Sequence, residues 1–247
     1  MQPGYRQGGC RSQPRRARPA VARYSNLLLR HARRTDRTTN SGGAGMNEKE
    51  KVNVVIDPGH GGSDPGAVNS QTGLQEADVV LRIAHALKAI MDTHPEFEVS
   101  LTREKDKAVS LKARTDLANE LDAPLVSIHC NAAPSAGAHG VETWCFAETN
   151  PDGSESAGHR LARAIQKEIV ALGLHDRGVK AIYDRQAGKY IFRKLWILRK
   201  SRRPAVIVEC GFISNAKDAA KLGDDHSGFK ERVAVALFTG IRNALLA

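Results

Sequence analysis

The chain has 247 residues, which is enough for one sizeable folded domain, and a hydrophobic content of 41% is sufficient for a core. It contains no apolar run long enough to cross a bilayer, and its four cysteines form no CxxC pair, which argues against a zinc ribbon or a thioredoxin-like site. The net charge of +10 is concentrated in residues 1–45, which hold ten arginines and one acid, whereas the remaining residues hold 27 basic and 26 acidic side chains and are nearly neutral.

Residues 1–45 are rich in Arg, Gly, Pro and Ser and lack hydrophobic periodicity. Two interpretations stay open: a disordered basic arm that contacts anionic polymers, or translated upstream sequence before a true start at Met46. The arginine-only basicity favours the second. The only apolar cluster, Leu27–Leu29, is too short for a secretory signal peptide. We therefore divide the chain into an extension, residues 1–45, and a folded part, residues 46–247.

The folded part alternates between strand and helix patterns. Short apolar runs predict strands at Val52–Asp57, Phe97–Thr102, Leu125–His129, Val141–Phe146 and Ala205–Glu209. Apolar residues at helical spacing predict helices at residues 76–92, 110–121, 155–172 and 228–246. This alternation predicts an α/β domain with a mainly parallel, twisted sheet flanked by helices.

Polar side chains follow three of the predicted strands. In parallel sheets, ligands bind at the carboxyl ends of strands, and His60, His129 and Glu209 all occupy such positions. Glu76 opens the first long helix and is close enough in sequence to fold back on His60. A catalytic zinc needs three nitrogen or oxygen ligands and one open position, so this group predicts a metal site. Each residue also has a structural alternative: Glu76 would suit the positive end of a helix dipole, and Glu209 could pair with an arginine.

The segment VVIDPGHGGSDPGA, residues 54–67, resembles the opening motif of the zinc-dependent N-acetylmuramoyl-L-alanine amidases. The likeness covers about residues 51–246 and continues through Gln75-Glu76, Leu101–Arg103, Ser127–Ala132, Arg177–Lys180 and Pro204–Asn215. The resemblance implies that His60, Glu76 and His129 bind Zn²⁺ and that Glu209 is the catalytic glutamate. It also implies a substrate, the amide between the lactyl group of N-acetylmuramic acid and L-alanine in peptidoglycan.

Two further residues are candidates for substrate binding. Asn131 lies two residues past His129, on the same side of an extended chain, where it would orient substrate or a ligand; a structural cap is an equal alternative. Glu142 is a weaker candidate for the wall of the site. Cys130 and Cys210 should point the opposite way, into the packed interior.

Residues 181–195 carry extra length compared with the pattern of the family. One interpretation is a hairpin or lid beside the cleft that contacts anionic wall polymer; a solvated loop is the slightly favoured alternative. The basic residues of the surrounding segment are Arg185, Lys189, Arg193, Lys194, Arg199, Lys200, Arg202 and Arg203, with no acid among them.

Three rival functions compete with the amidase as interpretations of this sequence. A metal-free wall-binding protein is disfavoured by the presence of all four site residues, and a nucleic-acid-binding protein by the neutral body and the lack of a recognisable motif. A zinc hydrolase that acts on a different amide is disfavoured only by the resemblance. Because the substrate lies outside the membrane, we expect action in the periplasm or outside the cell. Without a recognised signal peptide, the protein could also stay in the cytoplasm until lysis.

A chain that begins at Met46 is expected to fold with similar thermal stability and to cleave soluble muropeptides at the same rate. The extension has no apolar face to pack against the folded part. No burial of apolar surface would therefore compensate for the conformational entropy that it would lose on becoming ordered. Its charge could still increase binding to intact walls, an effect that should fade at high salt. Turnover of muropeptides and binding to whole walls by the two chains test this. An unfolded or inactive shorter chain would show that residues 1–45 belong to the fold.

Overall fold

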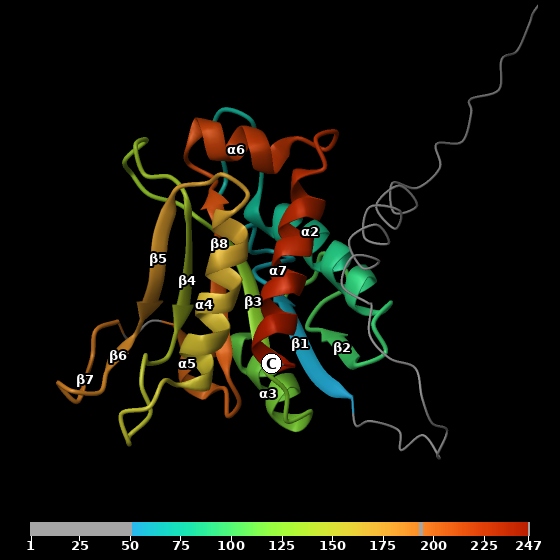
Figure 1. The fold of residues 1–247 in the computed structure, drawn as a ribbon. Helices are drawn as coiled ribbons and strands as arrows, with labels where there is room; N and C mark the ends of the chain where they lie inside the picture. Colours follow the sequence, from blue (N-terminus) through green and yellow to red (C-terminus); the bar gives the residue numbers. More distant parts are fainter. Residues whose placement is uncertain (1–50, 193–194, 247) are drawn as a thin grey trace, which may run out of the picture. The chain divides into compact units, whose positions relative to one another are not determined.

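A computed structural model describes residues 51–192 and 195–246, so the extension of residues 1–45 lies outside the described part. Its main feature is a six-stranded sheet in the order β2-β1-β3-β8-β4-β5 (Figure 1). The strands are β1 (Val52–Pro58), β2 (Phe97–Leu101), β3 (Leu125–Asn131), β4 (Val141–Cys145), β5 (Asp176–Ala181) and β8 (Ala205–Phe212). The prediction of an α/β domain with a mainly parallel sheet is confirmed.

One antiparallel pair determines which chain segments meet at the site. β1 pairs in parallel with β2 and β3, and β3 pairs in parallel with β8. β4 runs antiparallel to β8, and β5 runs parallel to β4. The carboxyl ends of β1, β3 and β8 therefore share one edge of the sheet with the amino ends of β4 and β5.

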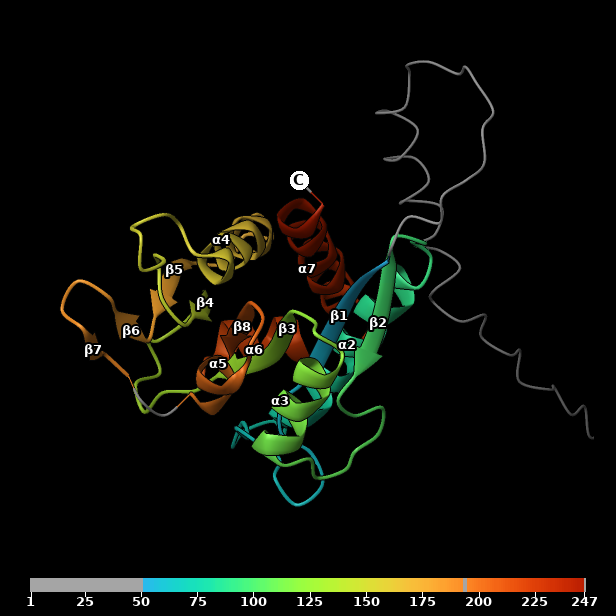
Figure 2. The same ribbon diagram turned by 90° about the horizontal axis from the view of Figure 1, so that it is seen from below.

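Helices cover both faces of the sheet (Figure 2). On one face α2 (Glu76–Met91), α4 (Ala157–Val170) and α7 (Phe229–Leu245) enclose the larger core. The other face carries α3 (Leu111–Glu120), the short α5 (Trp196–Lys200) and a smaller core. The eight-residue α6 (Ala216–Gly223) follows β8. None of the helices in the described part is long and apolar enough to cross a membrane.

Local signals explain where several helices begin. The Ser110 side chain accepts a hydrogen bond from the backbone N–H of Ala113 at the start of α3, and Ser156 accepts one from His159 at the start of α4. In α2 the apolar positions recur at helical spacing and are fully buried, for example Ile83 and Leu87.

The alternation of side chains along β3 and β8 separates packing residues from site residues. Cys130 and Cys210 are buried in the larger core, as predicted. His129 and Glu209, one residue earlier in each strand, are only partly buried and project to the opposite face of the sheet. The face that carries α3 and α5 therefore also carries the site.

The extra residues after β5 form a hairpin, but not a lid. β6 (Tyr183–Asp184) and β7 (Lys189–Tyr190) pair as a two-stranded antiparallel sheet. They follow the carboxyl end of β5, which lies at the edge opposite to the ends of β1, β3 and β8 (Figure 1). The less favoured interpretation, a hairpin or lid beside the cleft, is therefore wrong in its placement, because the antiparallel β4 reverses the direction of this part of the chain. Arg193 and Lys194 of the basic segment lie outside the described residues.

Candidate active site

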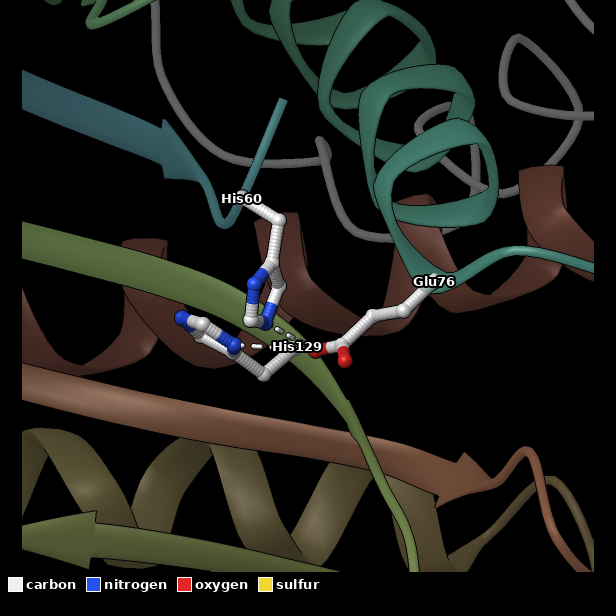
Figure 3. A group of neighbouring side chains, drawn as sticks. All are labelled: His60, Glu76 and His129. Atoms are coloured by element: carbon white, nitrogen blue, oxygen red, sulfur yellow. Dashed lines mark hydrogen bonds and ion pairs between the residues drawn. The ribbon is translucent and has the colours of Figure 1, made fainter. Parts of the chain in front are cut away.

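His60 lies on a tight turn directly after β1. Its backbone adopts the left-handed conformation with φ of 59°, which is uncommon for a residue with a side chain. Arg114 Nη2 donates a hydrogen bond of 2.7 Å to the carbonyl oxygen of His60 and so supports this conformation. The turn points the imidazole back over the end of the sheet, toward α2 and β3 (Figure 3).

His60, Glu76 and His129 converge at the carboxyl edge of the sheet (Figure 3). Glu76 Oε1 lies 3.1 Å from His60 Nε2 and 2.9 Å from His129 Nδ1. One ligand atom from each of the three side chains lies within 4.8 Å of the others. Two imidazole nitrogens and one carboxylate oxygen are a donor set that zinc accepts in catalytic sites, so the residues present fit the metal that the sequence predicts.

Neighbouring groups orient the three side chains. Asp64 Oδ2 lies 2.8 Å from His60 Nδ1, an arrangement that leaves Nε2 directed at Glu76. The backbone N–H of Cys130 donates to Glu76 Oε1, and that of Ala67 donates to Glu76 Oε2, both at 2.9 Å. Asp64 was not singled out from the sequence, although it lies within the recognised motif.

The mutual contacts shift the pKa values of all three groups. Burial alone would lower the pKa of His60, but hydrogen bonds and charges of Glu76 and Asp64 outweigh it and raise the pKa to about 9. Burial also favours a lower pKa for His129, but the hydrogen bond and charge of Glu76, with the charge of Glu209, outweigh burial and raise this pKa. Burial favours a higher pKa for Glu76, yet the two histidines hold it well below its ordinary value. Glu76 is therefore a carboxylate, and metal binding would require the histidines to lose protons.

Two buried arginines hold the turn that carries His60. Arg103 donates to the carbonyl oxygens of Pro58 and Gly59, at 2.9 and 2.7 Å, and Arg114 donates to Pro58 at 2.8 Å. Arg114 also pairs with Asp57 at 2.6 Å. Asp57 is fully buried, and its carboxylate accepts further hydrogen bonds from Thr102 and Ser127. These hydrogen bonds compensate for the buried charge of Asp57 and also satisfy the backbone carbonyl oxygens of the turn.

Glycines provide the space in which the three side chains meet. A Cβ atom at Gly59 would lie 2.3 Å from His129 Cε1, and one at Gly66 would lie 2.6 Å from Glu76 Oε2. Gly66 also has φ of 67°, which disfavours any other residue. Glycine at these positions is therefore required by the close approach of the chain to the candidate ligands.

We expect Gly59→Ala to weaken zinc binding by about tenfold to a hundredfold, the scale on which disturbed ligand support acts. The added methyl group would displace the His129 ring, which can move, rather than a backbone segment, so the fold should persist. Gly137→Ala is a matched control, because its Cβ would meet only Ser135 Oγ at 3.6 Å. Zinc titration of both variants tests this. Equal zinc affinity in both would show that the His129 ring position does not matter for metal binding.

Glu209 lies next to the three candidate ligands. It pairs in register with His129 of β3 and, on its other side, with Glu142 of β4. Its Oε2 atom is buried and has no hydrogen-bond partner among the described residues, so the arginine partner considered as an alternative is not present there. Burial, reinforced by the charges of Glu76 and Glu142 and opposed by His129, raises the pKa of Glu209 to about 7. A carboxylate whose pKa lies near neutrality is suited to proton transfer.

Asn131 and Glu142 contact each other rather than the three candidate ligands. Asn131 Nδ2 donates to Glu142 Oε1 at 3.0 Å, and Trp144 Nε1 donates to the same oxygen at 3.1 Å. Arg177 Nε donates to Glu142 Oε2 at 2.8 Å. Arg177 was part of the recognised motif but was not proposed as a site residue. It joins the site only because the antiparallel β4 places the amino ends of β4 and β5 at this edge.

Residues 54–243 match the family model described as N-acetylmuramoyl-L-alanine amidase. The chain belongs to this family. Among solved structures, the catalytic domain of the amidase CwlV from Bacillus (Paenibacillus) polymyxa var. colistinus is 34% identical, with a TM-score of 0.67 over 78% of this chain and 98% of that chain. The amidase from Clostridium difficile 630 is 30% identical, with a TM-score of 0.70 over 81% of this chain and 99% of that chain.

Curated relatives of this chain include a phage protein. The endolysin of Bacillus phage SPP1 is 37% identical over 174 residues, which make up 70% of this chain and 59% of the endolysin. The chain spans about half the length of the first curated relatives that it matches. Family membership therefore applies to the α/β domain described above.

Proposed function

We propose that this amidase-family chain hydrolyses the amide between the lactyl carbonyl of N-acetylmuramic acid and L-alanine in peptidoglycan. The observation that carries the proposal is the convergence of His60, Glu76 and His129 beside Glu209, whose buried Oε2 atom has no hydrogen-bond partner within residues 51–192 and 195–246. Ligands of parallel sheets bind at the carboxyl ends of the strands, so this edge is a suitable place for the hydrolysis that the family description names.

In the proposed reaction, His60, Glu76 and His129 would hold a zinc ion. Zinc bound there would lower the pKa of a water molecule and polarise the scissile carbonyl. Glu209 accepts a proton from the attacking water and then donates it to the nitrogen of L-alanine as the carbon–nitrogen bond breaks. The nearly neutral pKa of Glu209 suits both halves of this transfer, because the side chain must be ionised first and protonated later.

Asn131 and Glu142 are proposed to support substrate binding. Asn131 is partly exposed at the site and sits two residues past a candidate ligand. Glu142 is only 4% exposed, and both its oxygens already accept hydrogen bonds, so its contribution would be indirect.

Mass analysis of products from purified peptidoglycan tests the proposed function. Zinc-loaded protein should release stem peptides with free L-alanine amino termini, and a chelator should abolish the release. Glu155→Gln, a change at a surface ion pair on the other face of the sheet, is a control that should leave products unchanged. New reducing sugar ends, or amino termini other than L-alanine, would show that a different bond is cleaved.

Because peptidoglycan lies in the cell envelope, we propose that the protein acts there. We also propose that the basic segment from Arg185 to Arg203 contacts anionic wall polymer. Arg185 packs over the rings of Phe146 and Tyr183, at 5.9 and 5.8 Å, on the hairpin remote from the site. Exchange of the exposed Lys189 for glutamate should then weaken binding to intact walls at low salt while turnover of soluble muropeptides stays unchanged. Unchanged wall binding would argue for a solvated hairpin.

A further inference from the structure

Four side chains lie in a row across the sheet at the candidate active site. His129 of β3, Glu209 of β8 and Glu142 of β4 are paired in register, and Arg177 of β5 bonds to Glu142. Neighbouring strands are about 4.8 Å apart, so the backbone at Arg177 lies two strands, or about 10 Å, from that at Glu209. Arg177 is thus the outermost member of a polar row that begins at a candidate metal ligand.

A β-bulge directs Arg177 toward this row. Val141 pairs with Asp176 and Thr143 pairs with Val179, so two residues of β5, Arg177 and Gly178, face one residue of β4. Gly178 adopts φ of 82°, and a Cβ there would meet no other atom within 4 Å, so glycine serves the backbone conformation and not close packing. Bulges of this kind commonly re-aim a side chain beside an active site.

Glu142 holds Arg177 in place. It accepts hydrogen bonds from Arg177, Asn131 and Trp144 while remaining 4% exposed, so it has no accessible oxygen to offer a substrate. The guanidinium of Arg177 also lies 4.9 Å above the centroid of the Phe212 ring. An ion pair on one side and an aromatic ring on the other fix the plane of the guanidinium before any ligand arrives.

The rest of the Arg177 guanidinium is available for a ligand. Only its Nε donates a hydrogen bond, and its two terminal nitrogens have no partner within residues 51–192 and 195–246. The side chain is 34% exposed. A guanidinium offers five N–H donors, and its terminal pair matches the two oxygens of a carboxylate. The arrangement is therefore suited to an anion that approaches from the site side.

The proposed substrate limits what this anion can be. The amino sugars of peptidoglycan are neutral, and the lactyl carboxyl group is consumed in the scissile amide, so negative charge resides in the stem peptide. The carboxylate nearest to the scissile bond belongs to the second stem residue, a D-glutamate that continues the chain through its side-chain carboxyl group. An extended chain advances about 3.3–3.6 Å per residue, so this carboxylate lies roughly 7–10 Å from the scissile carbonyl, which is similar to the roughly 10 Å between the backbones of Arg177 and Glu209.

We propose that Arg177, held by the positioning residue Glu142, binds the free carboxylate of the second stem residue and so selects stem peptides in which that carboxylate is not amidated. This inference rests on the proposed function. It adds a specificity-determining contact on the peptide side of the scissile bond, separate from the three candidate metal ligands and Glu209.

The test uses two probes that differ in one group: N-acetylmuramoyl-L-alanyl-D-glutamate γ-methylamide, which has a free α-carboxylate, and N-acetylmuramoyl-L-alanyl-D-isoglutamine γ-methylamide, in which that carboxylate is an amide. The γ-methylamide replaces the rest of the stem peptide, so the second probe carries no carboxylate. Wild-type protein should prefer the acid, and Arg177→Gln should raise KM for the acid by about tenfold to a hundredfold with little change in kcat. KM for the amide should change less than about twofold. Arg163→Gln is the matched control, because Arg163 forms a comparable pair with Glu155 on the exposed surface of α4.

A second set of variants separates recognition from support of the fold. Arg177→Gln leaves Glu142 without its cation, so the double change Glu142→Gln with Arg177→Gln, which removes both charges, should show the same loss of preference for the acid. Arg177→Lys should retain part of the preference through its charge. Equal losses on acid and amide in the single and double variants would overturn the proposal and leave Arg177 as a structural partner of Glu142.

Binding measured without turnover tests the carboxylate site separately from the proposed reaction. Calorimetric titration of both probes into Glu209→Gln protein, with and without Arg177→Gln, measures the preference directly. If wild-type protein cleaves neither probe but Arg177 still governs binding of the acid, the reaction is misassigned and the carboxylate site stands. If the acid and the amide bind equally, or neither binds, the carboxylate site is refuted.

Discussion

Replacement of Glu209 by glutamine is expected to lower muropeptide turnover by about a hundredfold or more, the usual contribution of a general base. Glutamine keeps the shape of the side chain but cannot accept the proton of the attacking water. Oε2 of Glu209 has no partner in the described part of the chain, so the change breaks no hydrogen bond there, and the protein should fold and bind zinc as before. Turnover of a soluble muropeptide and elemental analysis of the same sample measure both expectations.

Glu155→Gln is the matched control for this change, since it removes a carboxylate just before α4 that pairs with His159 and Arg163 on that helix. It should leave turnover within about twofold of wild type, as surface pairs contribute little. Near-normal turnover of Glu209→Gln protein that contains a full complement of zinc would rule out the proposed role. Loss of zinc from that variant would instead assign Glu209 to the metal site.

The pKa of Glu209 also predicts how turnover depends on pH. As a base the side chain acts only when ionised, so kcat/KM should fall as pH drops through its pKa, which burial raises to about 7. A bound cation lowers this pKa, so the acid limb of the profile should lie at or below pH 7. Because the folded pKa is higher than the unfolded one, ionisation of Glu209 costs stability as pH rises from about 4.5 to 7. Glu209→Gln should remove that cost.

Single replacements of the three candidate ligands are expected to remove most of the bound zinc. The expectation for His60→Ala and His129→Ala follows from the convergence of both imidazoles on Glu76 Oε1, within 3.1 Å. A site with only two protein ligands holds zinc far more weakly than one with three. Elemental analysis of purified protein, after dialysis against zinc-free buffer, should give about one zinc per wild-type chain and much less in each variant.

His85→Ala is the control for these changes. His85 lies on the exposed side of α2 and hydrogen-bonds to the carbonyl oxygen of Glu104, away from the three candidate ligands. Zinc content should stay at the wild-type level in this variant. Full zinc occupancy in both His60→Ala and His129→Ala would mean that the ligands have been wrongly assigned.

Much of the fold was predictable because it depends on local patterns. The strands Val52–Pro58 and Leu125–Asn131 are short, largely apolar segments rich in β-branched residues, and α2 and α7 repeat apolar residues at helical spacing. β5 was not predicted. As an edge strand it is only partly buried, so Asp176–Ala181 shows neither alternation nor an apolar run. The short helices α5 and α6 were missed because a few turns do not establish a period.

The sequence by itself determined the family, the candidate ligands His60, Glu76 and His129, and the candidate base Glu209, because these residues occur in contiguous motifs next to recognisable strands and helices. Only the tertiary structure placed the hairpin of residues 183–190 at the far edge and brought the amino ends of β4 and β5 to the site. Strand direction depends on which partner a strand finds, and no local pattern encodes that choice. The support of His60 by Arg114 and the pairing of Arg177 with Glu142 join residues 54 and 35 positions apart. Such contacts form only once the sheet has brought these residues together, so local sequence patterns do not predict the surroundings of the site.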